Sequence, residues 1–217
     1  MNSKFINDFR SKIVLNEEQK SIIVGLMLGD GCFETQNGGR TYRLKIEQTL
    51  KHKEYVDWLY AKLRNLVLAE PLPREKRIGN KIYDNYGFQT VSCGNFRFYA
   101  QQFYDQESRK KKIPKIISKL LTPLALAVWF MDDGQIKSNR HRALLINSQC
   151  FGKEDLELLR GALNNKFGIE TGLKREKTGF RIYLLSATIQ KFLDAINPFI
   201  LSSMKYKLGR INNLPKE

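Results

Sequence analysis

The chain carries the stretch IVGLMLGDG at residues 23–31, and a similar stretch, LAVWFMDDG, follows at residues 126–134. Both are apolar on nearly every face, which is typical of a buried helix rather than an amphipathic surface helix. Neither is long enough to cross a bilayer. Each helix is predicted to stop at its Asp-Gly pair, since glycine readily takes the left-handed conformation that closes a helix. We therefore expect two buried helices with two similar halves arranged around them.

Each of these helices ends in an aspartate, Asp30 in the first copy and Asp133 in the second. A helix C-terminus carries partial negative charge, so it repels a carboxylate by up to about 1 kcal/mol. Two core helices with ordinary acid-glycine turns are one explanation. Acids in two repeated positions indicate instead that something positive lies between them. A divalent cation is the simplest candidate, because Mg²⁺ prefers a few carboxylates together with water and phosphate oxygens.

The length of 217 residues allows one large domain or two fused halves of about 100 residues each. The formal net charge is +15, and Lys and Arg are spread along the chain rather than gathered in a tail. This excess points to an anionic partner and favours a folded nucleic-acid-binding surface. The sequence shows no signal peptide and no transmembrane segment, so we expect no membrane partner.

The cysteines and histidines show no metal-binding spacing. Cys32, Cys93 and Cys150 are far apart, which predicts reduced thiols in an intracellular protein. His52 and His141 lie in polar stretches, and neither has a second ligand at useful spacing. We expect both histidines at the surface or in contact with DNA.

Both halves alternate helices and strands. After a polar lead-in, the first half is predicted to contain a helix over 17–29, a hairpin turn at 37–39, a strand over 41–48, a helix over 51–67, two strands between 74 and 93, a helix over 96–105 and a basic loop over 109–114. The second half is predicted to contain a helix from Pro123, a polar loop over 135–142, a strand over 143–149, a helix over 152–167, strands over 170–176 and 180–186, a helix over 188–200 and a basic end over 205–210.

This matching order indicates a duplicated domain rather than a solenoid. We predict a lead-in at residues 1–16, a first repeat at 17–121 and a second repeat at 122–217.

The duplicated apolar run ending in Asp-Gly resembles the signature of the LAGLIDADG homing endonucleases, in the single-chain form that carries two copies. The second copy, preceded by Leu-Thr-Pro at 121–123, is particularly similar to the branch that includes yeast intron-encoded endonucleases. The segments Lys-Lys-Ile-Pro at 111–114 and Tyr-Lys-Leu at 206–208 resemble that branch too. The resemblance covers nearly the whole chain.

It implies an α+β fold of two pseudo-symmetric αββαββα repeats. The signature helices would pack together at a pseudo-twofold axis, and the antiparallel sheets would form a saddle over the DNA major groove. One departure concerns the packing of the helices, because the second copy has Val128 and Asp132 where the first has Gly25 and Gly29. We expect close packing to rely on other small residues, such as Ala125 and Ala127.

The resemblance also implies the site. Asp30 and Asp133 would bind divalent metal at the scissile phosphates, with Gly29 and Asp132 beside them as further candidate ligands. Asp132 precedes the matching acid and is the weaker candidate. Mg²⁺ is the expected ion, and Mn²⁺ or Ca²⁺ could occupy the same sites.

Basic residues at the ends of the repeats would lie beside the active centre. Lys111 and Lys207 could stabilise developing negative charge or tune a water. Lys112 and Lys205 compete with them for this role, and Lys111 could instead only hold phosphate.

Polar residues late in the first strand of each half could order the attacking water. The candidates are Glu47 or Gln48 in the first half and Asn147 or Gln149 in the second. As ordinary strand residues they would need no such role.

Strand faces and loops supply the candidate DNA contacts. Arg and Lys suit guanine edges and Gln suits adenine, while many basic residues will touch only phosphate. The predicted DNA-binding residues are Arg43, Lys45, Arg74, Lys76, Arg77, Lys81, Tyr83, Gln89, Lys112, Lys174, Arg175, Lys177, Arg181 and Lys205.

Together these features predict a monomeric, metal-dependent endonuclease that makes a double-strand break at a long, non-palindromic DNA site. It would be organellar if it is intron-encoded. An RNA maturase or a non-catalytic nucleic-acid-binding protein of the same fold is the alternative, and the presence of both acids favours the nuclease. Glu18-Gln19-Lys20 also fits an E-x-K nuclease pattern, but no strand context supports it.

Overall fold

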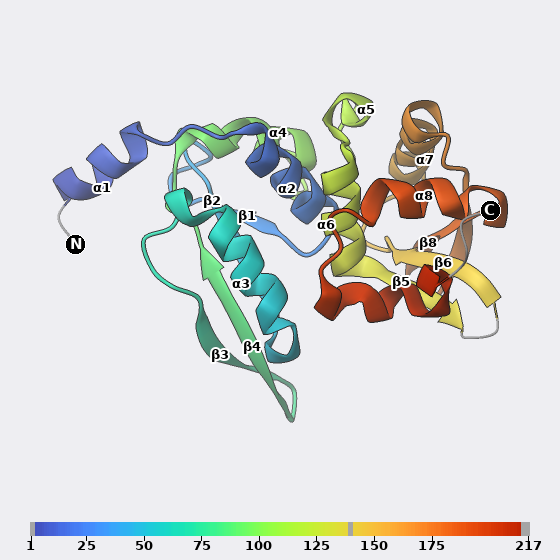
Figure 1. Cartoon of the computed structure of the whole chain (residues 1–217). Coiled ribbons are helices and arrows are strands. Elements are labelled where there is room, and N and C mark those ends of the chain that lie inside the picture. Colours follow the sequence, from blue (N-terminus) through green and yellow to red (C-terminus); the bar gives the residue numbers. More distant parts are fainter. Residues whose placement is uncertain (1–2, 139–140, 214–217) are drawn as a thin grey trace. The chain divides into compact units, whose positions relative to one another are not determined.

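The computed structural model describes residues 3–138 and 141–213 (Figure 1). It divides into two compact units, which we describe separately. Unit 1 is formed by Met1–Lys20 and Asp30–Gln101, and unit 2 by Ser21–Gly29 and Gln102–Glu217. Most of the first signature helix therefore belongs to the same unit as the second. The side chain of His141 lies outside the described part, so its predicted surface position stays a prediction.

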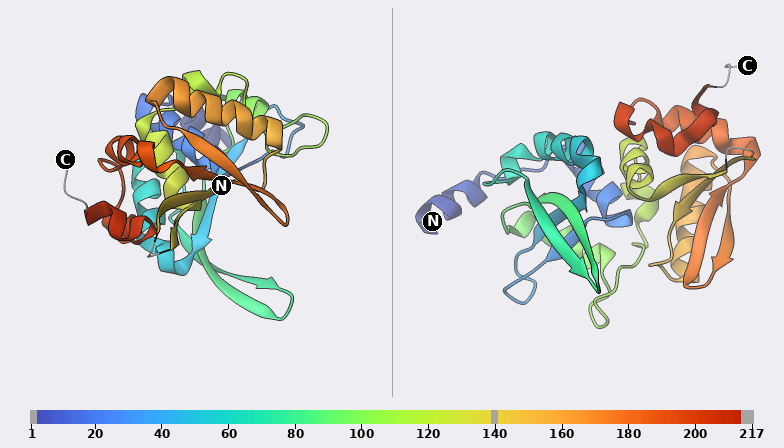
Figure 2. Two further views of the ribbon diagram at one scale, coloured as in Figure 1. Left: turned by 90° about the vertical axis from the view of Figure 1, so that its right-hand side faces the viewer. Right: turned by 90° about the horizontal axis from the view of Figure 1, so that it is seen from below.

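Unit 1 contains one four-stranded antiparallel sheet in the order β1-β2-β4-β3. Its elements are α1 (Ser3–Ser11), the first turn of α2 (Glu17–Leu28), β1 (Cys32–Glu34), β2 (Arg43–Thr49), η1 (Leu50–His52), α3 (Lys53–Lys62), η2 (Arg64–Leu66), β3 (Leu72–Ile78), β4 (Lys81–Gln89), η3 (Gly94–Phe96) and α4 (Arg97–Phe103). The last two residues of α4 extend into unit 2. Helix α3 buries Tyr55, Val56 and Leu59 against one face of the sheet. The β3–β4 hairpin projects beyond the rest of the unit (Figures 1 and 2).

Unit 2 contains a second four-stranded antiparallel sheet, in the order β5-β6-β8-β7. Besides the rest of α2, its elements are α5 (Ile117–Leu120), α6 (Pro123–Asp133), β5 (Gly134–Ser138), β6 (His141–Asn147), α7 (Lys153–Phe167), β7 (Thr171–Glu176), β8 (Gly179–Leu184), η4 (Ser186–Thr188), α8 (Ile189–Ile196) and η5 (Ser202–Asn213). Helix α6 is buried from Leu124 to Met131 and packs on α8.

The two sheets connect their strands in the same order, so the predicted α+β fold of two αββαββα repeats is confirmed. Repeat boundaries at 17–121 and 122–217 stay a prediction. Residues 134–138 were predicted as a polar loop and form strand β5 instead, and β1 and α5 were not predicted as separate elements. Gly31 and Gly134 were also expected to close their helices in the left-handed conformation, but neither has a positive φ. The φ of Gly134 is −73°, because the chain passes straight from α6 into the extended strand.

Both signature helices begin at side-chain caps, which are Asn16 and Thr122. Asn16 Oδ1 accepts from the Gln19 backbone N–H at 2.8 Å, and Gln19 Oε1 accepts in return from the Asn16 N–H at 3.3 Å. This reciprocal pair satisfies donors that a helix start leaves open. Thr122 Oγ1 accepts from the Ala125 N–H at 3.1 Å, with Pro123 at the first helical position. Helices of the described residues are too short or too polar to span a membrane.

Candidate functional site

The two signature helices make a close, unsymmetrical contact within unit 2. A Cβ added at Gly25 would lie 2.6 Å from both the Ala125 carbonyl oxygen and the Val128 Cβ. A Cβ added at Gly29 would lie 2.3 Å from Asp132 Oδ2. The glycines of the first helix thus leave the space that the larger residues of the second helix fill. The close approach of Gly25 to Ala125 agrees with the expectation for Ala125, and the contact also involves Val128 and Asp132 of the second helix.

Each helix ends beside a lysine from a distant part of the chain. Lys111 Nζ donates to the Gly29 carbonyl at 2.6 Å, and Lys207 Nζ donates to the Asp132 carbonyl at 2.6 Å and to the Met131 carbonyl. Carbonyls in the last turn of a helix lack intrahelical donors, so a cation is favourable there. Both lysines bind the residue directly before an acid, Asp30 or Asp133. The same charge arrangement therefore occurs at the end of both signature helices.

Asp30 is the first residue of the Asp30–Gln101 segment of unit 1, and its carboxylate accepts a hydrogen bond from Gln48. Gln48 Nε2 donates to Asp30 Oδ2 at 2.8 Å, and His52 Nδ1 lies 3.4 Å from Gln48 Oε1. Asp30 is exposed, while Gln48 and His52 are half-buried. Between the two candidates of this strand, Gln48 contacts the acid. The position of His52 behind Gln48 was not predicted, because it depends on the turn that follows β2.

Glu47 points to the opposite face of β2, as alternation along a strand requires. Its Oε1 accepts from Asn85 Nδ2 at 2.9 Å, and its Oε2 lies 3.3 Å from Lys45 Nζ. Burial raises the pKa of Glu47, but hydrogen bonds from Asn85 and Lys45 and the charges of Lys45 and Lys76 outweigh this and lower the pKa. Glu47 is therefore ionised at neutral pH and belongs to a polar network on the sheet face.

The second pair of strand candidates occupies a different environment. Asn147 ends β6 opposite Arg181 of β8. Its Oδ1 is buried, and the described atoms include no hydrogen-bond partner for it. Gln149 follows in the turn, where its carbonyl would lie 2.9 Å from a Cβ added at Gly179. Only Asn147 thus stands on the sheet, and its unsatisfied acceptor suits a water or a ligand.

The candidate metal ligands are hard oxygen donors. Asp132 and Asp133, the last residues of α6, are half-buried, and Asp30 offers a carboxylate oriented by Gln48. Carboxylates next to a solvent-accessible helix end fit Mg²⁺, which keeps several waters and needs few protein ligands. Among the residues described, no three or more His, Cys, Asp or Glu side chains gather as a cluster. The donors therefore fit a hydrated hard cation rather than an enclosed structural metal.

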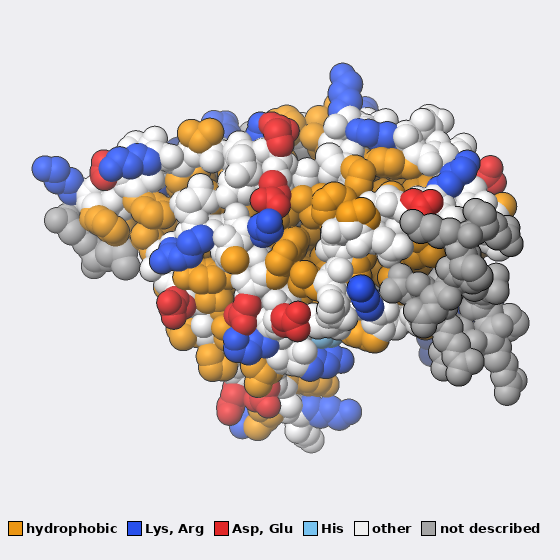
Figure 3. Space-filling view, in the orientation of Figure 1, with side chains coloured by type: hydrophobic (Ala, Val, Ile, Leu, Met, Phe, Trp, Pro, Cys, Tyr) orange, Lys and Arg blue, Asp and Glu red, His pale blue; other side chains and the backbone are white. Residues whose placement is uncertain are grey.

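The strand register sorts the predicted DNA contacts of unit 1. Leu44 and Ile46 of β2 face the core, so their neighbours face outward. The outward face, extended across the sheet by the register, carries Arg43, Lys45, Arg74, Lys76, Lys81, Tyr83 and Gln89. Arg77 pairs with Ile82 and lies on the opposite face, and its contact with DNA stays a prediction. In Figure 3, Lys and Arg lie next to Asp and Glu on the projecting hairpin.

Unit 2 shows a similar arrangement. Lys174 pairs with Arg181, which pairs with Asn147, so these three share the outward face. Arg175 pairs with Phe180 and lies on the other face, and its contact with DNA stays a prediction as well. Lys177 lies in the turn between β7 and β8, outside the strands. Lys112 lies in the loop before α5. Lys205 lies in η5 and is exposed.

Comparison with known proteins adds to this geometry. The model of the LAGLIDADG DNA endonuclease family matches residues 20–192. The DNA endonuclease I-ChuI of Chlamydomonas applanata is 31% identical over 209 residues, which are 90% of this chain and 96% of that protein. The cytochrome b mRNA maturase bI2 of Saccharomyces cerevisiae is 35% identical over 206 residues, which are 90% of this chain but 48% of that protein.

Solved structures show the same fold. The homing endonuclease I-WcaI, bound to its DNA recognition sequence, superposes with a TM-score of 0.87 at 27% identity, covering 95% of this chain and 93% of that one. I-DmoI with its nicked target DNA and Mn has a TM-score of 0.53 at 15% identity, over 86% of this chain and 98% of that one, a likeness of fold alone.

Proposed function

Because the chain belongs to the LAGLIDADG DNA endonuclease family, we propose that it is a site-specific DNA endonuclease that hydrolyses both strands of a long target. One observation carries this proposal. Asp133 is the last residue of α6 and Asp30 lies two residues after α2, and a lysine binds the carbonyl directly before each acid. The chemistry-bearing residues are thus present in both halves, as cutting two strands requires.

The two acids are the proposed metal ligands. Asp30 and Asp133 would each supply a carboxylate to a divalent ion, with Gly29 and Asp132 adjacent. When bound, Mg²⁺ supplies an activated water and neutralises charge on the phosphate. Mn²⁺ or Ca²⁺ could occupy the same positions, and I-DmoI, which shares the fold, is known in complex with DNA and Mn.

The surrounding side chains orient these acids. Gln48 fixes one oxygen of Asp30 through its amide N–H. Lys111 and Lys207 place positive charge beside the acids and, in addition to their helix-end contacts, would favour an incoming phosphate. Asn147, with its unsatisfied acceptor, would hold a water in the second half.

The sheets would read the DNA. A strand of eight residues covers about 26 Å, or roughly eight base-pair steps, at about 3.3 Å per residue. The outward faces of the two sheets carry different side chains, so the target need not be palindromic. Since one chain holds both halves, we propose that the enzyme is a monomer. It would be intron-encoded and organellar, a proposal that the intron-encoded endonuclease of Wickerhamomyces canadensis among its relatives supports.

A maturase function is the second candidate, favoured by the 35% identity to the yeast cytochrome b mRNA maturase. The matched region covers about half of that protein, so splicing activity could depend on its other half. Binding to intron RNA that survives competition by excess target DNA would support it.

Cleavage of a randomised duplex library in Mg²⁺ tests the main proposal and reads out the target together. Asp30→Asn and Asp133→Asn should abolish double-strand cleavage while leaving binding of the recovered target largely intact. Asp194→Asn, an exposed change on α8, is the matched control and should cut normally. Full cleavage by either active-site variant would refute the assignment of the acids.

A further inference from the structure

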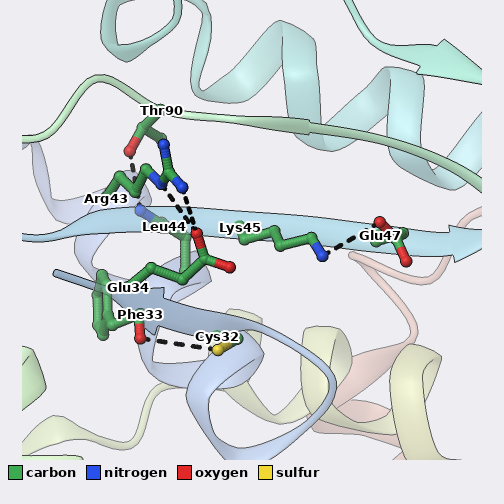
Figure 4. Close-up of polar contacts among 8 residues, drawn as sticks. All are labelled: Cys32, Phe33, Glu34, Arg43, Leu44, Lys45, Glu47 and Thr90. Atoms are coloured by element: carbon green, nitrogen blue, oxygen red, sulfur yellow. Dashed lines mark hydrogen bonds and ion pairs between the residues drawn. The ribbon is translucent and has the colours of Figure 1, made fainter. Parts of the chain in front are cut away.

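Basic side chains on the outward face of the unit 1 sheet are held by glutamates of the same face (Figure 4). Arg43 on β2 donates from Nε and Nη2 to one oxygen of Glu34 on β1, at 2.9 and 2.7 Å. Lys45 Nζ lies 3.3 Å from Oε2 of Glu47, two residues along the same strand. Two cations predicted to contact DNA therefore each have a carboxylate partner before DNA arrives.

The outward face of the unit 2 sheet repeats this arrangement with other residues. Glu176 Oε1 lies 3.1 Å from Lys174 Nζ and 3.8 Å from Arg181 Nη1. Lys174 and Glu176 are two residues apart on β7, as Lys45 and Glu47 are on β2. The arrangement thus occurs in both sheets at positions that are not equivalent by duplication.

Folding stability does not explain the pair of Arg43 and Glu34. The Arg43 and Glu34 side chains are 29% and 35% exposed, and partly exposed ion pairs contribute little to stability. A carboxylate on a face that meets DNA also weakens the attraction to phosphate. The pair adds little stability and weakens the attraction to phosphate, so it is explained by its effect on how the cation binds DNA.

A cation without such a partner binds phosphate irrespective of sequence. A paired cation is neutralised and fixed in orientation, so it gains less from phosphate. Glu34 occupies the Nε–Nη2 edge of the Arg43 guanidinium. The Nη1–Nη2 edge can then make the bidentate contact to O6 and N7 of guanine.

We propose that Glu34 is a specificity-determining positioning residue, which holds Arg43 for contact with a base and withholds it from phosphate. This inference rests on the proposed DNA-cleaving function. Glu47 acts in the same way on Lys45, and Glu176 on Lys174.

The test compares Glu34→Gln with Glu75→Gln. Glu75 is exposed on β3 and faces away from Arg74 and Lys76, so its substitution removes the same charge from the opposite face of the same sheet. Binding is measured in EDTA, over a series of salt concentrations, to the target duplex recovered from the randomised library and to a scrambled duplex of equal composition.

For Glu34→Gln we expect tighter binding to the scrambled duplex and a logarithmic salt dependence steeper by about 0.9, the value of one added phosphate contact. The ratio of target to scrambled affinity should fall by about tenfold, which is within the range of one bidentate base contact. Glu75→Gln should leave both the ratio and the slope as in the wild type. Equal behaviour of the two variants would overturn the inference.

A double-mutant cycle then tests whether Glu34 acts through Arg43. Glu34→Gln combined with Arg43→Gln should show the same affinity ratio as Arg43→Gln alone, and additive losses would overturn the inference. Thermal unfolding of Glu34→Gln should match the wild type, since the amide preserves the shape of the side chain. A wild-type protein that binds both duplexes equally and cuts neither would refute the proposed function itself. A discriminating wild type with an unaffected Glu34→Gln variant refutes only the role of Glu34.

Discussion

Replacing Gly25 by alanine should destabilise the protein, although alanine is the better helix former. The added Cβ would meet the Ala125 carbonyl oxygen and the Val128 Cβ at 2.6 Å, whereas ordinary contact begins at 3.4 Å. The two helices would have to separate by about 0.8 Å there, and a backbone oxygen cannot rotate away. Overpacking of this kind costs about 1–3 kcal/mol, while the helix propensity of alanine returns about 1 kcal/mol. We expect a net loss of up to about 2 kcal/mol.

Gly161→Ala supplies the matched control for this substitution. Gly161 lies inside α7, and a Cβ added there would meet nothing within 4 Å. The same chemical change should therefore stabilise the protein by about 1 kcal/mol. Urea unfolding followed by circular dichroism measures both variants, and the midpoints should move in opposite directions. A Gly25→Ala protein as stable as Gly161→Ala would refute the close contact between the two signature helices.

Three further predictions concern single side chains. Lys207→Ala removes the donor to two carbonyls at the end of α6, so it should lower the free energy of unfolding in urea by about 1–3 kcal/mol. It should also slow cleavage more than it weakens DNA binding. Equal losses of cleavage and binding would make Lys207 a phosphate contact only. Maleimide labelling followed by mass spectrometry should modify exposed Cys32 and Cys150 but spare Cys93, whose thiol is buried and has its pKa raised by that burial; rapid labelling of Cys93 in the folded protein would contradict its position. The pKa of Glu47 is lowered from the usual 4.5, so its stabilising contribution is present above that value and is lost as the pH falls through the lowered pKa. The unfolding free energies of wild type and Glu47→Gln should differ at pH 7 and converge on acidification, and a constant difference would contradict the lowered pKa.

Local signals explain why much of the fold was predictable. Helices were predicted over 17–29 and from Pro123, and each begins at a side-chain cap, Asn16 or Thr122. Strand β5 was missed because residues 134–138 form a short edge strand with only one large apolar side chain, Ile136, and that pattern resembles a loop. The error at Gly134 has the same origin. A helix that runs straight into a strand needs no left-handed residue, and only knowledge of the strand reveals this.

The site was predictable by residue type but not by geometry. The repeated Asp-Gly runs single out Asp30 and Asp133, because an acid at the end of an apolar helix is unusual. Nothing local shows that Lys111 and Lys207 reach the carbonyls before these acids, since those contacts join distant segments. Strand alternation decides between Glu47 and Gln48, but only once the core face of β2 is known.

The unsymmetrical contact between α2 and α6 bears on how such a chain can change during evolution. Two copies of the first helix would set glycine against glycine and leave a void. Two copies of the second would set Val128 against Val128 and bring two Asp132 carboxylates together. Neither helix can therefore make the same contact at the same separation with a copy of itself. In a chimera that takes one half from a relative, the imported helix must fit the helix that is kept. It must place larger side chains against Gly25 and Gly29 of α2, or small residues against Val128 and Asp132 of α6.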